Sequence, residues 1–73
     1  MDKPYYDYQL VLDAQKRCNG ANVHHMNTLL SQYECLFEIA EDAGEYTFIN
    51  GSQFHVYGEI ERIHKRLSEL IHP

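Results

Sequence analysis

Apolar side chains recur every three or four residues over residues 23–42, which is the spacing of one face of an α-helix. Asn22 precedes this stretch as a candidate N-cap, and Gly44 follows it as the residue type that commonly ends a helix. A helical wheel gathers one apolar face, which consists of Met26, Leu29, Leu30, Tyr33, Leu36, Phe37 and Ala40. We expect this face to form the core.

Residues 45–57 show a second pattern, which is typical of a β-hairpin. Asn50-Gly51 separates two aromatic and β-branched runs, 46–49 and 54–57, and both turn residues tolerate the positive φ of a type I′ turn. Gly58 should end the second strand. Because an isolated two-stranded ribbon is marginally stable, we expect one face of the hairpin to pack on the helices.

The C-terminal stretch, residues 59–71, predicts a second amphipathic helix. Its apolar side consists of Ile60, Ile63, Leu67, Leu70 and Ile71. The opposite face alternates in charge through Glu61, Lys65 and Glu69, as is common on a solvated helix.

The first stretch, residues 4–18, supports two interpretations. Strict alternation through Tyr6, Tyr8, Leu10 and Leu12 is typical of a strand. The boundary signals favour a helix: Pro4 suits the first helical position, Asp7 the first turn, bases lie near the end, and Asn19-Gly20 can form a left-handed stop. We predict a helix because the signals agree at both ends.

These elements predict a small single α+β domain over residues 1–73, in the order α-α-β-β-α, with a two-stranded antiparallel hairpin packed on helices. If the first stretch is a strand, the order becomes β-α-β-β-α with a three-stranded sheet. A chain of this size buries only about 60% of the surface that its unfolded form exposes, so it can build one core.

Charge is unevenly distributed along the chain. The formal net charge is −5, and the chain from Cys18 to Glu61 carries seven carboxylates and no Lys or Arg. Nucleic acids and anionic membranes attract clustered cations, so this balance argues against both and favours a basic partner. No stretch is long and apolar enough to span a bilayer, and two cysteines without a signal peptide indicate a soluble, cytoplasmic protein.

Most of these acids lie on one flank of the helix predicted over residues 23–42. The flank comprises Glu34, Glu38, Glu41 and Asp42, with Glu45 just beyond the helix. Like charges four residues apart cost about 0.2–0.5 kcal/mol per pair, and acids near a helix C-terminus oppose its dipole. Solubility is one explanation of this flank. The functional one is a docking face for a basic surface, with Tyr46 and Tyr57 as hydrophobic contacts.

Motifs of known chemistry are absent from the sequence. Cys18, Cys35 and the five histidines show no metal-ligand spacing, and His24 and His25 are adjacent, so their side chains diverge on a helix. No nucleophile motif, paired catalytic carboxylates in a cleft or phosphate loop is present. We therefore expect no catalytic, metal or cofactor site, and no enzyme.

One basic cluster, Arg62, Lys65 and Arg66 with His64 nearby, raises nucleic-acid binding. Glu61 and Glu69 interleave with these bases, which is typical of a solvated helix face, so we expect no direct contact with nucleic acid.

Together these features predict a small acidic protein-binding regulator or inhibitor. We expect it to dock stoichiometrically on a basic surface of a larger protein, including a surface that binds nucleic acid. In outline only, it looks like the compact inhibitors that phages and mobile elements encode. The alternative is a homo-oligomeric interaction module such as a homodimer, because Cys35 and Ile39 lie outside the core stripe.

Overall fold

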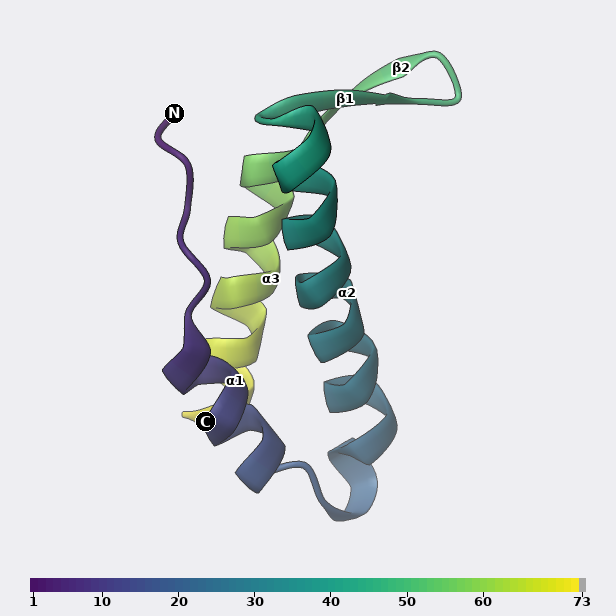
Figure 1. Cartoon of the computed structure of the whole chain (residues 1–73). Helices are drawn as coiled ribbons and strands as arrows, with labels where there is room; N and C mark the ends of the chain where they lie inside the picture. Colours follow the sequence, from purple (N-terminus) through teal and green to yellow (C-terminus); the bar gives the residue numbers. More distant parts are fainter. Residues whose placement is uncertain (73) are drawn as a thin grey trace.

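Three helices and one β-hairpin make up the fold, and the computed structural model describes residues 1–72 (Figure 1). The elements are α1 (Tyr8–Lys16), the 3₁₀ turn η1 (Gly20–Asn22), α2 (Val23–Ala43), β1 (Tyr46–Ile49), β2 (Ser52–His55) and α3 (Val56–Ile71). The predicted order α-α-β-β-α is confirmed. The alternative with a third strand is wrong, because the first stretch forms a helix.

The two long helices, α2 and α3, lie side by side and form the body of the molecule (Figure 1). Helix α1 packs across them at the end that holds the start of α2 and the end of α3. The hairpin projects from the opposite end, and the N-terminal segment runs back along the body between the two ends. The hairpin is therefore the part of the described chain that stands farthest from α1.

The core lies where the three helices meet, and it follows the predicted apolar faces. Its largest fully buried side chains are Tyr33, Met26, Ile60, Ile63, Leu67 and Val56. Phe37, predicted to be core, is only half-buried: its ring lies edge-on to Tyr33 at a centroid distance of 5.0 Å and to Tyr6 at 5.2 Å. An N-terminal aromatic side chain thus completes the core on this side.

Helix α1 begins later than the sequence suggests. Asp7 is its N-cap, and Asp7 Oδ1 accepts a hydrogen bond from the Leu10 amide at 3.0 Å. Pro4 lies in the N-terminal segment rather than at the first helical position, so that prediction was wrong. At the far end, Gly20 has a φ of 55°, and the side chain of Asn22 bonds back to the Asn19 amide instead of capping α2.

The hairpin turn forms at Asn50 and Gly51, whose φ values of 52° and 80° confirm the predicted positive-φ turn. Because this turn has two residues, Ile49 pairs with Ser52 and the second strand is Ser52–His55 rather than 54–57. Helix α3 then begins at Val56, so Gly58 lies inside a helix and does not end the strand, another prediction that was wrong.

Candidate functional site

The predicted acidic flank divides into two groups according to hydrogen bonding. Glu38, Glu41 and Asp42 are exposed on the C-terminal half of α2, and no described residue forms an ion pair or side-chain hydrogen bond with them. They lie on the last turns of the helix that leads into the hairpin. These three carboxylates are the part of the flank that the fold does not use.

Glu34 and Glu45 contribute to the fold instead. The Tyr6 hydroxyl donates a hydrogen bond to Glu34 Oε1, and burial together with this carboxylate raises the pKa of Tyr6 above its ordinary value. Glu45 Oε2 accepts a hydrogen bond from His55 Nε2 at 3.1 Å and lies 3.7 Å from the N-terminal amine. Both residues connect segments that are distant in sequence, so they are less available to a partner.

The hairpin that follows α2 exposes apolar side chains. Tyr46 is 47% exposed, and its ring stacks on His55 with centroids 4.8 Å apart. Phe48, two residues along β1 and therefore on the same face, is 72% exposed, and Ile49 is 47% exposed. Phe54 packs against the core from the other face. Strand alternation with Tyr46 would have singled out Phe48, which the sequence-based site omitted.

Tyr57, the other predicted hydrophobic contact, is only 9% exposed and belongs to the core. The prediction of Tyr57 as a surface contact was therefore wrong. Helix α3 begins at Val56, so Tyr57 lies in a helix and faces the core instead of lying on a strand. We name the remaining surface the acidic–aromatic end, and it consists of Glu38, Glu41, Asp42, Tyr46, Phe48 and Ile49.

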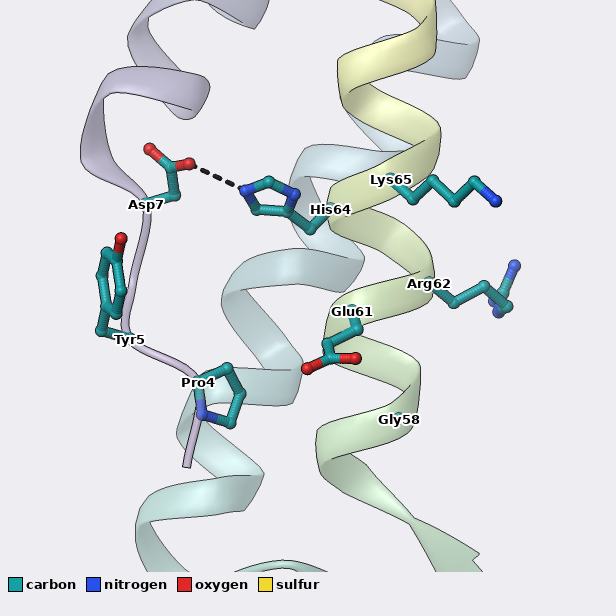
Figure 2. A pocket seen from close by; sticks show the side chains of 8 residues that line it. All are labelled: Pro4, Tyr5, Asp7, Gly58, Glu61, Arg62, His64 and Lys65. Atoms are coloured by element: carbon teal, nitrogen blue, oxygen red, sulfur yellow. Dashed lines mark hydrogen bonds and ion pairs between the residues drawn. The ribbon is translucent and has the colours of Figure 1, made fainter. Parts of the chain in front are cut away.

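A separate groove of about 640 Å³ lies between the N-terminal segment and α3 (Figure 2). Across it, His64 Nε2 donates a hydrogen bond to Asp7 Oδ2 at 2.8 Å. This bond and the Leu10 amide hold the pKa of the Asp7 carboxyl below its ordinary value. The Asp7 amide also donates to the buried Tyr33 hydroxyl at 3.1 Å. The pair therefore attaches the N-terminal segment to the helix pair.

The groove does not bring a set of reactive groups together. Figure 2 shows Glu61 directed toward Pro4, whereas the Arg62 and Lys65 side chains extend away from Asp7. An imidazole held by a carboxylate can act as a base, but the described residues lining the groove include no Ser, Thr or Cys to serve as a nucleophile. The Asp7–His64 pair has a structural role, which is to hold the N-terminal segment against α3.

The other candidate residues lie elsewhere. Arg62 forms a forked ion pair with Glu59, its Nη2 lying 2.8 Å from Glu59 Oε2, so part of the basic cluster is internally neutralised. The Cys18 thiol donates to backbone and side-chain oxygens of α2, and Cys35 is exposed. Within residues 1–72, no three His, Cys, Asp or Glu side chains are grouped as metal ligands would be.

Comparison of the chain with protein-family models, with curated proteins and with solved structures gave no match in any of the three. In the described part of the chain, none of the helices has both the length and the apolar character needed to cross a membrane.

Proposed function

We propose that this protein is a small binding regulator or inhibitor that docks, one copy to one, on a basic surface of a larger protein through its acidic–aromatic end. The observation that carries this proposal is that three carboxylates without a partner among residues 1–72 lie on the last turns of α2, the helix that leads into the strand β1 with its exposed apolar residues.

The carboxylates are unfavourable for the isolated fold. Glu38 and Asp42 are four residues apart on one helix, and such a like-charge pair costs about 0.2–0.5 kcal/mol. Glu41 and Asp42 lie in the last turn of α2, which holds no basic residue, so they also face the negative end of the helix dipole. A complementary surface would relieve both effects, which supports docking on a cationic partner.

The exposed apolar residues of β1 supply binding energy that charge complementarity alone does not. Binding energy at protein interfaces concentrates in a few buried aromatic side chains, whereas charged residues at the rim mainly raise the association rate. Phe48 and Tyr46 project from the same face of a protruding strand, so they can enter a pocket that the helices cannot reach. In this arrangement the acids orient the partner and the rings anchor it.

Occupying a basic surface has a direct consequence for regulation. If that surface normally binds DNA or RNA, the docked protein covers the cations that hold the phosphates, and the nucleic acid is excluded. The protein then acts as a stoichiometric competitor and needs no catalytic group.

Reversing the charge of the acidic–aromatic end tests the proposal. The wild type, the triple variant Glu38→Lys/Glu41→Lys/Asp42→Lys and the control Glu69→Lys are each used as bait for capture from the source cell, in buffers from about 50 mM to 500 mM salt. Glu69 is also an exposed acid in the last turn of a helix, but it lies at the far end of α3.

We expect the wild type and Glu69→Lys to capture the same basic proteins, in amounts that decrease with salt, and the triple variant to lose them. Retention of every captured protein by the triple variant would contradict the proposal.

A further inference from the structure

The hydrogen-bonding pattern of the hairpin leaves one set of β1 backbone groups directed outward. The Val56 amide donates to the Glu45 carbonyl at 2.8 Å, so this pair is hydrogen-bonded across the ladder. In an antiparallel pair, hydrogen-bonded and non-hydrogen-bonded positions alternate. With the observed register, the positions whose amides and carbonyls point away from β2 are therefore Tyr46 and Phe48.

Nothing in residues 1–72 occupies this edge. The sheet has two strands, and the described backbone contains no hydrogen bond to the outward amide of Tyr46 or Phe48. In Figure 1 the base of the hairpin lies over the end of the helix pair, and its turn end projects beyond the helices. An open edge of this kind accepts an added strand, which gains main-chain hydrogen bonds together with side-chain contacts on both faces.

Side chains distinguish the β1 edge from the β2 edge. The two outward residues of β1 are exposed aromatic groups, whereas their partners on the opposite edge, Gln53 and His55, are polar. Glu41 and Asp42 lie in the last turn of α2, which leads into the base of β1 through Gly44 and Glu45. The edge therefore combines an apolar strip with a negative charge at one end.

We infer that the acidic–aromatic end binds its partner as an added β-strand on the β1 edge, and that this strand is extended, alternates apolar with polar residues and carries Lys or Arg. The inference rests on the proposed function and specifies the chemistry of the partner. A second copy of this chain is a poorer occupant, because it brings another net charge of −5 to the same place.

The test uses a capped eight-residue peptide of alternating lysine and valine, titrated into ¹⁵N-labelled protein, with a glutamate–valine peptide as control. We expect the lysine peptide to give saturable NMR shifts in β1 and to slow hydrogen exchange at the Tyr46 and Phe48 amides, but not at Gln53. The glutamate peptide should bind at least about tenfold more weakly.

Two substitutions separate the backbone contribution from that of the ring. Phe48→Ala removes only the ring, whereas Phe48→Pro also removes the outward N–H, which the hairpin does not use and which an edge strand can spare. Phe48→Pro should bind the peptide roughly two- to tenfold more weakly than Phe48→Ala. The matched variant Gln53→Pro, on the opposite edge, should bind like the wild type.

The outcomes separate the two ideas. If charge reversal of Glu38, Glu41 and Asp42 abolishes peptide binding but Phe48→Pro binds like Phe48→Ala, the docking surface stands and strand addition is overturned. If the peptide slows hydrogen exchange at the Tyr46 and Phe48 amides both with and without the charge reversal, strand addition on β1 is supported and the charge-based docking proposal is overturned. Absence of shifts, or dimerisation of the free protein that Phe48→Pro prevents, would also overturn a basic partner strand.

Discussion

At the scale of single residues, carboxylates of the same chemistry serve different purposes here. Asp7 caps α1 and bonds to His64, and Glu34 and Glu45 accept hydrogen bonds from Tyr6 and His55. The three acids of the acidic–aromatic end have no such partner among residues 1–72. These three carboxylates are therefore available to a binding partner.

Asp7 gives a prediction about pH. Its pKa in the folded protein lies below the ordinary 3.8, so its stabilising effect is present above that pH and is lost as the pH falls through the folded-state pKa. Asp7→Ala removes the cap and should lower the free energy of unfolding by about 0.5–2 kcal/mol near neutral pH. Urea denaturation of both proteins should show this difference shrinking below about pH 4.

Asp13→Ala is the matched control. It removes a carboxylate from the same helix. Among the described residues, the Asp13 carboxylate accepts a hydrogen bond only from the exposed Gln9 side chain, and it caps no helix end. A difference between wild type and Asp7→Ala that stays constant from neutral to acid pH would show that the charge of Asp7 does not contribute.

Part of this residue-level picture could be read from the sequence. Asp7 was expected near the start of a helix, because an acid there satisfies free amides. Its bond to His64 could not be predicted, since the two residues are 57 positions apart and meet only once α1 packs on α3. Tyr57 was misplaced because apolar residues at 54, 56 and 57 fit a strand and the start of a helix equally well.

At the scale of elements, the helix and strand periods predicted α2, α3 and the hairpin but not every boundary. Helix α1 was predicted from its boundary signals, against a strand-like alternation, and η1 was not predicted. The faces of α2 and α3 repeat over several turns, so these helices were clear. The junctions depend on single backbone conformations, as at Gly44, where φ is 77° and ψ is −144°. This region of φ and ψ is accessible essentially only to glycine, and it directs the chain from α2 into β1.

Gly44→Ala should therefore destabilise the protein although its side chain has room. A Cβ at this position would meet no atom within 4 Å, so only backbone strain opposes the substitution. We expect a loss of about 1–3 kcal/mol in the free energy of unfolding, measured by urea denaturation.

Asn50→Gly, in the hairpin turn, is the control for Gly44→Ala. It places glycine at a positive φ of 52° that already holds a side chain, so stability should be unchanged or slightly higher. If Gly44→Ala is as stable as the wild type, the junction relaxes to another conformation and the strain argument is wrong.

At the scale of the whole molecule, the two ends have different chemistry. One end is closed by α1, whose packing against α2 and α3 buries Leu10, Val11 and Ala14. The other carries the hairpin and the unpartnered acids, and there the sequence pattern conflicts with local stability. Glu69 opposes the dipole of α3 in the same way, but it is a single acid, whereas three acids gather on the last turns of α2. Local conflicts of this kind are expected at functional sites.

This conflict leads to a prediction about stability. Replacing Glu41 and Asp42 by Lys puts cations at the C-terminus of α2 and converts the Glu38–Asp42 repulsion into an attraction. The double variant should gain about 0.5–2 kcal/mol in the free energy of unfolding at low salt, and the gain should shrink at high salt. Glu69→Lys, in the last turn of α3, should also stabilise the fold, but it should leave partner binding intact. Urea denaturation at two salt concentrations, paired with the capture assay, measures both effects. If Glu41→Lys/Asp42→Lys is less stable than the wild type, then the acids support the fold in a way that the dipole and pair arguments miss, and they no longer single out this end as a binding surface.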